Sequence, residues 1–289
     1  MPELPEVETI RRDLENKITG EKIKDIKILA TKSIHNKSSD FLKVLVGNNF
    51  KHIERRGKLL MLALSKVDKF AYLLVHLKMT GQLIYRNKKQ LLVGGHSQTG
   101  MTTGVPNKFT RAIFVFSNGG QLFFNDLRRF GYLKLVSKEE KEKIVTNNFG
   151  IEPLTPDYTL EAFADLFKKR QTNIKALLLN QKLIAGIGNI YADETCFEAR
   201  ILPFRKVSSL TGQEIKKLYR AIEHVLKLSI KNRGTTFNNY VDSDGNIGSH
   251  INFLKVYGRA GQKCRRCRHI ILKKKHAGRG THYCANCQK

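Results

Sequence analysis

The sequence predicts a two-domain α+β protein whose N-terminal domain is a β-sandwich or barrel and whose C-terminal domain is mainly helical. Before residue 147, many short segments alternate apolar and polar side chains, whereas segments after residue 158 follow a helical period. Pro153 and Pro156 mark the change in composition between these two regions. The chain has 289 residues, which is enough for two hydrophobic cores.

The first predicted element is a helix that starts very close to the N-terminus. Pro5 suits a first helical turn, where its missing N–H costs nothing, and Glu6 suits the positive end of the helix dipole. An apolar stripe at helical spacing follows, made up of Val7, Ile10, Leu14 and Ile18. We therefore expect a helix that packs along its whole length.

The start of this helix is a candidate reactive group. We expect Met1 to be removed because Pro2 is small, which leaves a secondary amine with Glu3 beside it. An α-amino group titrates near pH 8, against about 10.4 for lysine, so far more of it is free base at neutral pH. Such amines form Schiff bases with sugar or carbonyl carbons. From this stretch alone, an ordinary capped helix is the better interpretation.

The predicted strands of the first domain follow this helix and are short. They lie in residues 23–28, 50–55, 58–64, 72–79, 82–85, 111–116, 121–125 and 132–136. Ser117-Asn118-Gly119-Gly120 predicts a hairpin turn, and residues 87–107, rich in Gly, Thr and Lys, predict a long mobile loop. Many short strands separated by turns favour a β-sandwich or a barrel.

The second domain is predicted to be mainly helical, with helices at residues 160–169, 174–179, 190–199 and 212–229 and a loop at 233–252. A glycine-rich turn, residues 185–191, separates two of these helices. Asn189 would cap the second one and expose its free N–H groups to an anion. A simple helix–helix turn is an equally good interpretation. Nearby positive charge comes from Lys168, Lys169, Arg170 and Lys175.

Four of the five cysteines lie near the C-terminus, at Cys264, Cys267, Cys284 and Cys287. Two Cys-x-x-Cys pairs separated by sixteen residues are typical of a four-cysteine zinc ribbon. Four thiolates leave no open position on the metal, so one structural Zn²⁺ is predicted. Two disulfides are the alternative, but disulfides are rare in the reducing interior of a cell, where we expect this protein. The fifth cysteine, Cys196, is predicted to be buried and inert.

The charge balance predicts a polyanionic partner. The chain has 52 Lys and Arg against 25 Asp and Glu, a formal net charge of +27, and nucleic acid is the first candidate. A membrane surface or a ribosomal role is the alternative. Residues 259–289 contain ten Lys or Arg and no acidic residue, and Arg279 lies between the two cysteine pairs. No transmembrane-length apolar run or signal peptide is visible, so we expect a soluble intracellular protein with no membrane partner.

Three further segments carry side chains that could act on nucleic acid. Lys58 follows Arg55-Arg56-Gly57 on a turn, where a solvated lysine is the simpler interpretation. Met79 lies in a strand-end segment, residues 76–81, and Arg128 and Phe130 lie in another, residues 126–131. Bulky side chains at such turns could wedge into a base stack, although taken singly they are more often ordinary core or rim residues.

Taken together, these motifs resemble those of bacterial formamidopyrimidine-DNA glycosylases. The resemblance covers residues 2–8, Lys58 with its preceding Arg-Arg-Gly, residues 76–81, 126–131 and 186–191, and the ribbon with His276-Ala277-Gly278-Arg279. The motifs occur in the family's order over nearly the whole chain. Two departures are visible, because the family often has histidines where Phe109 and Arg111 stand and a proline where Leu127 stands.

The resemblance implies a fold and a division of the chain. Residues 1–147 would form the catalytic β-sandwich domain with its N-terminal helix, and residues 148–158 a linker. Residues 159–258 would form a helix-two-turn-helix domain with a lesion-capping loop at 233–252, and residues 259–289 the four-cysteine zinc ribbon.

The resemblance also implies roles for single residues. Pro2 would attack C1′ of the damaged nucleotide, Glu3 would handle protons at the sugar, and Glu6 would help to hold the site. Lys58 would donate a proton linked to β-elimination, and Arg279 would grip phosphate and assist δ-elimination. The DNA contacts would come from Met79, Arg128, Phe130, Arg170, Asn189 and Arg111.

The predicted function is therefore a DNA glycosylase and AP lyase of base excision repair that excises oxidised purines. Its expected partner is damaged double-stranded DNA, and we expect a cytoplasmic, nucleoid-associated monomer in a bacterium. One alternative is an endonuclease VIII-like enzyme for oxidised pyrimidines, which shares the fold and the proline mechanism. Another is a non-catalytic zinc-ribbon protein, which leaves the N-terminal motif and Lys58 without a role.

Overall fold

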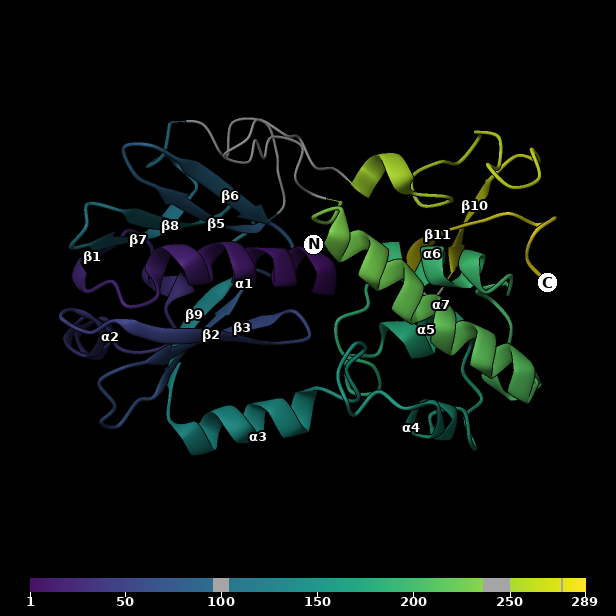
Figure 1. Cartoon of the computed structure of the whole chain (residues 1–289), viewed down its shortest axis with the longest axis horizontal. Helices are drawn as coiled ribbons and strands as arrows, with labels where there is room; N and C mark the ends of the chain where they lie inside the picture. The colour runs from purple at the N-terminus through teal and green to yellow at the C-terminus, as the bar shows by residue number, and fades with distance from the viewer. Residues whose placement is uncertain (96–103, 236–249, 277) are drawn as a thin grey trace. The chain divides into compact units, whose positions relative to one another are not determined.

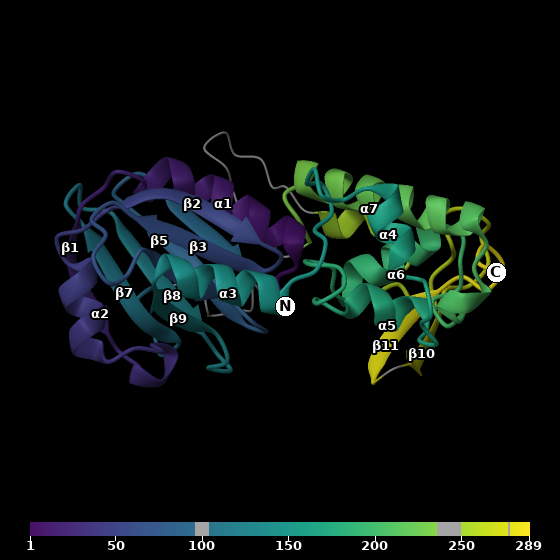
Figure 2. The same ribbon diagram turned by 90° about the horizontal axis from the view of Figure 1, so that it is seen from below.

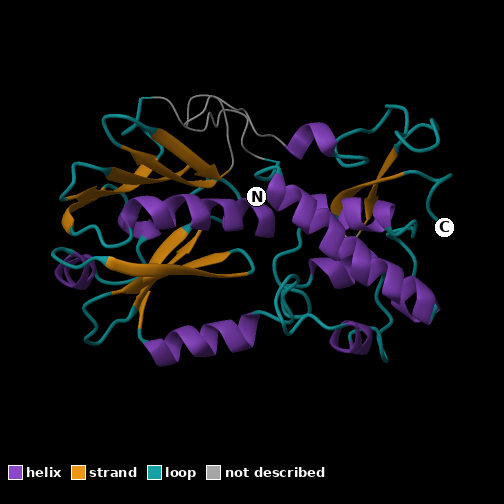
Figure 3. Cartoon of the chain, viewed as in Figure 1, coloured by secondary structure: helices purple, strands orange, loops and turns teal. Residues whose placement is uncertain are grey.

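The protein consists of two compact units, each formed from two stretches of the chain. A computed structural model describes residues 1–95, 104–235, 250–276 and 278–289. The first unit contains Met1–Thr146 with Asn232–Ser249, and the second contains Asn147–Lys231 with His250–Lys289. Figure 3 shows that strands dominate the first unit and helices the second. The predicted boundaries at 147, 158 and 258 stay a prediction.

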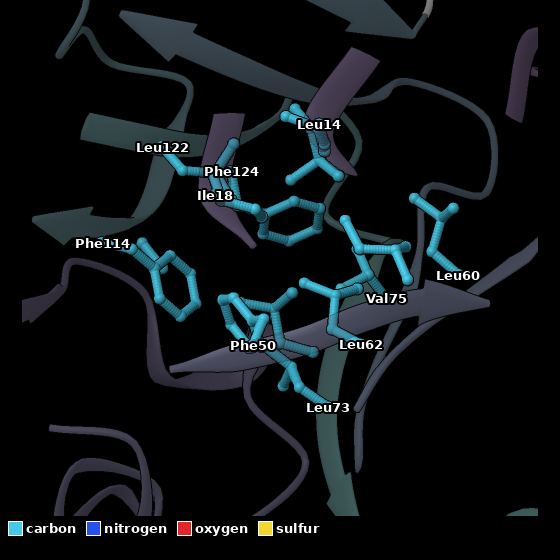
Figure 4. Packing of buried hydrophobic residues seen from close by; sticks show 14 of the residues in the cluster. Leu14, Ile18, Phe50, Leu60, Leu62, Leu73, Val75, Phe114, Leu122 and Phe124 are labelled. Atoms are coloured by element: carbon cyan, nitrogen blue, oxygen red, sulfur yellow. The ribbon is translucent and has the colours of Figure 1, made fainter. Parts of the chain in front are cut away.

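The first unit is a β-sandwich of two antiparallel sheets (Figure 1). The five-stranded sheet has the order β1 (Ile23–Ile28), β7 (Thr110–Phe116), β8 (Gln121–Asp126), β5 (Gly81–Arg86) and β6 (Leu91–Gly95). The four-stranded sheet has the order β2 (Phe50–Arg56), β3 (Leu59–Leu64), β4 (Tyr72–His76) and β9 (Tyr132–Val136). Both sheets turn large apolar side chains into one core, among them Phe50, Leu62, Phe114 and Phe124 (Figure 4). The predicted sandwich is confirmed.

Helix α1 (Leu4–Ile18) packs against this sandwich and contacts strands of both sheets. Its predicted apolar stripe is buried throughout, with exposed fractions of 3% or less for Val7, Ile10, Leu14 and Ile18. Figure 2 shows α1 running beside β2 and β3. Burying a CH₂ group stabilises the folded state by about 0.8 kcal/mol, so this apolar stripe is a major reason for the helix to form. The N-terminal residues are thereby held against the edge of the core.

Three elements of the first unit differ from the sequence prediction. The predicted loop at 87–107 is wrong in part, because β6 (Leu91–Gly95) lies within it. This strand pairs with β5, with Gln82 opposite Gly95 at one end and Arg86 opposite Leu91 at the other. This strand depends on tertiary packing, since Gly94 lies so close to the Ile10 side chain that a Cβ atom would clash. Residues 96–103 of the predicted loop lie outside the described part. Helices α2 (Ser38–Leu45) and α3 (Lys138–Asn148) were not predicted.

Among its described residues, the second unit is built on four helices and a small hairpin. The helices are α4 (Leu160–Asp165), α5 (Ile174–Leu179), α6 (Asn189–Glu198) and α7 (Gly212–Lys231), close to the predicted ranges. The hairpin is β10 (Leu272–His276) and β11 (Arg279–Tyr283), and short 3₁₀ turns of this unit lie at Val207–Ser209 and His250–Phe253, whereas a third such turn, Thr31–Ser33, belongs to the first unit. Helix α6 packs on α5, α7 and β11 (Figures 1 and 2). Most of the predicted loop at 233–252 lies outside the described residues.

Among the described residues, no helix is both long enough and apolar enough to cross a membrane.

A buried carboxylate joins α1 to β2. Glu8 accepts hydrogen bonds from the guanidinium groups of Arg11, Arg12 and Arg55, the last at 3.0 Å from β2. Burial acts to raise the pKa of Glu8, but the hydrogen bond from Arg11, the charge and hydrogen bond of Arg55 and the hydrogen bond from Arg12 outweigh it and lower that pKa to about 2. The helix that starts at the N-terminus is thus fixed by charge as well as by apolar packing.

Replacing this carboxylate, as in Glu8→Gln, is expected to destabilise the first unit by about 1–3 kcal/mol at neutral pH. Because the folded pKa of Glu8 lies below the ordinary 4.5, its contribution is complete above about pH 4.5 and is lost as the pH falls through about 2. Urea unfolding at about pH 7 and pH 3 should therefore show a smaller penalty at the lower pH. The exposed Asp25 provides a control, Asp25→Asn, that should change little. A pH-independent penalty for Glu8→Gln would contradict this account.

Candidate active site and nucleic-acid interface

The N-terminal segment of the first unit is buried at the start of α1. Pro2 is buried, Glu3 is 2% exposed and Glu6 is fully buried. Glu3 and Glu6 form a capping box at the helix start, in which the N–H of Glu3 donates to Oε2 of Glu6 at 2.9 Å. Pro5 lies in the first turn, as predicted from its missing N–H. The residues that carry the candidate amine are therefore held by backbone geometry, not left as a loose chain end.

Burial of this chain end favours a free amine. With Met1 present, burial lowers the pKa of the terminal amino group, the charges of Glu3 and Glu6 raise it, and the charge of Lys58 lowers it, with a net decrease. Lys58 is itself buried, at the turn between β2 and β3. The structure therefore brings the predicted residues Pro2, Glu3, Glu6 and Lys58 into one electrostatic environment. The solvated-turn interpretation of Lys58 is wrong.

Glu6 also holds a segment far away in the sequence. Its Oε1 accepts a hydrogen bond from the backbone N of Thr235 at 2.8 Å and one from Thr235 Oγ1 at 3.1 Å. Nearby, Arg233 Nη2 donates to Asp13 Oδ2 at 2.6 Å. Residues 233–235, where the predicted lesion-capping loop begins, are thus tied to α1 at two points. Sequence reasoning missed Thr235, for which a glycine followed by a hydroxyl residue was the only local signal.

Two exposed turns of the sandwich carry the predicted wedge residues. Met79, Leu127 and Phe130 expose 36%, 40% and 54% of their surfaces, although apolar side chains of this size are usually buried. The guanidinium of Arg128 lies over the Phe130 ring, 4.7 Å from its centroid. Met79 and Phe130 are therefore not core residues, and the turns present apolar and cationic side chains to solvent together.

Arg111 is buried, whereas a side chain that contacts DNA would be expected at the surface. It is 6% exposed, with Nε donating to the carbonyl of Asp126 at 2.9 Å and Nη1 to the carbonyl of Lys108 at 3.2 Å. Burial and the charge of Arg129 lower the pKa of Arg111, while the charge of Asp126 raises it. The side chain supports the turn that begins at Asp126, and its predicted contact with DNA stays a prediction.

In the second unit, the turn before α6 differs from the predicted cap. The N-cap residue is Gly188, and Asn189 is the first helical residue, so its side chain does not reach back to the helix N–H groups. Asn189 Nδ2 instead donates to the carbonyl of Gly280 at 3.1 Å, and its Oδ1 is buried without a partner among the described residues. The prediction that Asn189 caps α6 is wrong, and the amide lies beside the zinc-ribbon hairpin.

Lys175 is not part of a surface charge cluster, contrary to the sequence prediction. It is fully buried and donates to Asp193 Oδ1 at 2.6 Å, Thr281 Oγ1 at 2.9 Å and the carbonyl of Gly280 at 3.1 Å. Asp193 Oδ2 in turn accepts from the backbone N of His282 at 2.8 Å. Removing one partner of such a buried pair typically costs about 3–5 kcal/mol. This network fixes the first residues of β11 next to α5 and α6.

The predicted phosphate-binding arginines of this unit are exposed. Arg279 begins β11, with its side chain in solvent and its neighbours Gly280 and Thr281 held by Lys175. Arg170 is also exposed, and its Nε donates to the carbonyl of Leu166 at 2.7 Å. Both side chains keep further N–H groups that a ligand in solvent could meet.

The four cysteines near the C-terminus form one cluster. Their Sγ atoms all lie within 4.8 Å of one another, and the pairs Cys264–Cys287 and Cys267–Cys284 lie at 3.9 and 3.4 Å. Tetrahedral zinc with bonds of about 2.3 Å places its sulfurs about 3.8 Å apart, whereas a disulfide needs about 2.05 Å. The donor set fits one structural Zn²⁺ with no open position. Cys196, by contrast, is fully buried, and burial raises the pKa of its thiol.

The comparisons with known proteins agree with this geometry. Residues 1–133 match the formamidopyrimidine-DNA glycosylase N-terminal domain, residues 149–240 the H2TH domain of the same enzymes, and residues 261–289 the zinc finger found in FPG and IleRS. The formamidopyrimidine-DNA glycosylases of Pelotomaculum thermopropionicum and Carboxydothermus hydrogenoformans are each 42% identical over 291 residues. These alignments cover 100% of this chain and 99% and 100% of the two relatives.

The chain belongs to the formamidopyrimidine-DNA glycosylase family. Solved structures of the Lactococcus lactis member are similar over its whole length. A complex of one of its point mutants with Fapy-dG-containing DNA is 34% identical, with a TM-score of 0.86 and coverage of 100% of both chains. A complex with abasic-site DNA is also 34% identical, with a TM-score of 0.86 and 99% coverage of both chains. The predicted fold is confirmed in its sandwich, its H2TH domain and its zinc finger.

Gly234 tests how tightly Glu6 is enclosed. Its φ is +80°, and a Cβ atom at this position would lie 2.7 Å from Oε1 of Glu6, so Gly234→Ala should displace the carboxylate. Gly20 has the same φ of +80° but no atom within 4 Å of its would-be Cβ, and Gly20→Ala should cost only about 1–2 kcal/mol of backbone strain. We expect a clearly larger loss of unfolding free energy for Gly234→Ala in urea titrations. Equal losses would show that Glu6 moves aside freely.

The zinc site can be tested by removing one ligand. Cys264→Ala should lose the metal, unfold the ribbon hairpin and weaken DNA binding, because a small zinc module draws much of its folding energy from the metal. Metal analysis and DNA titration would measure both losses, with circular dichroism checking that the sandwich remains folded. Cys196→Ala is the control and should keep the full zinc content. Active protein without zinc would contradict the assignment.

Proposed function

We propose that the protein is a bifunctional DNA glycosylase and AP lyase that excises oxidised purines, chiefly 8-oxoguanine and formamidopyrimidines. It would act in base excision repair and cleave the strand by β,δ-elimination. The observation that carries this proposal is the buried N-terminal segment, where Pro2, Glu3 and Glu6 share one environment with Lys58. The Lactococcus lactis relatives bound to Fapy-dG-containing and abasic-site DNA support the choice of substrate.

The first step uses the amine of Pro2 once Met1 has been removed. Its nitrogen lone pair attacks C1′ of the damaged nucleotide, the N–C1′ bond forms, and the glycosidic bond breaks with its electron pair leaving on the base. Loss of the amine proton and opening of the sugar give an iminium that links protein and DNA. Glu3 lies next in sequence and is the proposed group that moves protons at the sugar, while Glu6 fixes the backbone of Glu3.

The iminium activates the sugar for strand cleavage. Withdrawal of electrons by the iminium acidifies the C2′ proton, whose removal expels the 3′ phosphate in β-elimination. A second elimination then expels the 5′ phosphate, and water releases the protein from the sugar fragment. Lys58 is the proposed proton donor linked to β-elimination, and Arg279 is the proposed phosphate ligand that assists δ-elimination. With Met1 present, burial lowers the pKa of the terminal amine, and a buried site of this kind suits a nucleophile that must be unprotonated at neutral pH.

Binding would combine phosphate contacts with insertion into the base stack. Exposed Arg279 and Arg170, together with Asn189 and Arg111, are the proposed backbone contacts, and a chain of net charge +27 suits a polyanion. Met79, Arg128 and Phe130 are the proposed residues that fill the space left by the extruded lesion. Zn²⁺ would hold the ribbon's shape and take no part in the chemistry.

Two alternatives are less well supported. An endonuclease VIII-like enzyme would share the proline mechanism, but the relatives at 42% identity are named formamidopyrimidine-DNA glycosylases. A non-catalytic zinc-ribbon protein would give no role to the buried N-terminal segment. We further propose damaged double-stranded DNA as the partner, a monomeric state, and a cytoplasmic location at the nucleoid, in keeping with the bacterial relatives.

The nucleophile can be tested by trapping. Protein with Met1 removed should excise 8-oxoguanine from a duplex, and borohydride should reduce the iminium to a stable protein–DNA adduct that peptide mapping places on Pro2. Protein that keeps Met1 should bind DNA but neither excise nor crosslink, because the Pro2 nitrogen is then an amide. Rates would be measured in parallel on thymine glycol duplexes, which should be poorer substrates.

The matched variant is Lys58→Ala, which keeps the nucleophile. It should impair lesion processing but still give a trapped adduct at a preformed abasic site. A crosslink that maps to Lys58 would overturn the proline mechanism, and faster excision of thymine glycol than of 8-oxoguanine would support the endonuclease VIII-like alternative.

A further inference from the structure

The two turns that carry the wedge residues are neighbouring crossovers between the sheets of the sandwich. Residues 77–80 lead from β4 of the four-stranded sheet to β5 of the five-stranded sheet, and residues 127–131 lead back from β8 to β9. Strand β4 pairs with β9 and β5 pairs with β8, so that Gly81 lies opposite Asp126 and His76 opposite Tyr132. The fold therefore places the Met79 turn beside the turn that carries Arg128 and Phe130.

A buried hydrogen bond joins these two turns. Thr80 Oγ1, on the first turn, donates to Oδ1 of Asp126, at the start of the second. Thr80 is 4% exposed and Asp126 is fully buried. A hydrogen bond between a hydroxyl and a buried carboxylate is strong, because the acceptor is charged and no water competes for it.

The same pair also closes the second turn. The backbone N of Arg128 donates to Thr80 Oγ1 at 3.0 Å and to Asp126 Oδ1 at 3.2 Å, and the backbone N of Gly131 donates to Asp126 Oδ2 at 2.7 Å. From the other side, Arg111 donates to the carbonyl of Asp126. The backbone that carries Arg128 and Phe130 is thus bonded to a residue of the Met79 turn.

Backbone geometry shows that both turns are firmly held. Lys78 and Arg129 adopt positive φ angles of 48° and 58°, which non-glycine residues rarely do unless the surroundings impose them. Each turn also ends at a glycine where a Cβ atom would be crowded: on Gly81 it would clash with the backbone of Leu77, and on Gly131 it would lie 3.0 Å from the carbonyl oxygen of His76. The strain is local to the exposed wedge residues.

We propose that Thr80 and Asp126 are positioning residues that lock the two turns into one preformed wedge. Met79 then enters the duplex in register with Arg128 and Phe130, instead of each turn being ordered separately when DNA binds. Ordering in advance lowers the entropy lost on insertion, so the benefit falls on base extrusion and not on the chemistry at C1′. This inference rests on the proposed function.

The test compares Thr80→Val, which keeps the shape but removes the hydroxyl, with Thr80→Ser, which keeps the hydroxyl. Both are made in the full chain with Met1 removed and zinc bound. Single-turnover excision of 8-oxoguanine from a duplex should slow about tenfold in Thr80→Val, the effect of about one hydrogen bond. Cleavage of an abasic site in a single strand, which needs no extrusion, should keep its rate, and Thr80→Ser should restore duplex excision.

Two further readouts separate positioning from general instability. Hydrogen exchange without DNA should speed up at the Arg128 amide in Thr80→Val, with amides in the centre of β8 unchanged. In a Phe130→Ala background, Thr80→Val should add less slowing than in the wild-type chain, because one of the side chains that the bond positions is already removed.

The inference is overturned if Thr80→Val slows both substrates equally, leaves duplex excision at the wild-type rate, or matches Thr80→Ser. If the wild-type protein itself excises no base and traps no adduct, the proposed function fails instead. The exchange of the Arg128 amide then decides whether the two turns are locked.

Discussion

The carboxylate of Glu6 is the constraint on which the candidate active site depends. One of its oxygens accepts the N–H of Glu3 at the start of α1, and the other accepts the N–H and the hydroxyl of Thr235, 229 residues along the chain. A fully buried carboxylate is stable only when its lone pairs are satisfied, so both segments must come to it. Glu3, the residue after the candidate nucleophile, and Thr235 are therefore fixed by the same group.

In the second unit, too, buried charged groups hold separate segments together by satisfying their hydrogen bonds, here as a pair of opposite charges. Lys175 and Asp193 are both fully buried, and each satisfies its remaining hydrogen-bonding capacity on β11. The hairpin of the zinc ribbon is consequently anchored by two independent devices, the four thiolates at one end and this ion pair along β11. Exposed Arg279 is the first residue of this tethered strand, which gives its long side chain a defined starting point.

The sandwich adds a third buried carboxylate with a similar task. Asp126 holds the turn of Arg128 and Phe130 and joins it to the turn of Met79, because the crossovers between the sheets lie side by side. At this turn and at the start of β11, the exposed side chains proposed to meet DNA, Phe130 and Arg279, are aimed by groups that are buried and paired, whereas at the N-terminal site the proposed residues are themselves buried. Such a division lets a strongly basic surface be built on a well-ordered frame, with the cost of burying polar groups offset by complete hydrogen bonding.

The sequence alone determined features that depend on local spacing. Alternation and turn residues located most strands, the 3.6-residue period located α1 and α4 to α7, and two Cys-x-x-Cys pairs located the zinc ligands, because each signal lies within a few residues. What only the tertiary structure decided depends on contacts between distant segments. Strand β6 exists because it pairs with β5 under α1, and Lys58 is buried instead of solvated. Lys175 serves an ion pair instead of a basic surface, and Thr80, Asp126 and Thr235 acquire partners that no spacing in the sequence foretells. The sequence shows which side chains are polar, but the hydrogen-bond partner of a buried polar side chain is decided only by the folded chain, which brings distant residues together.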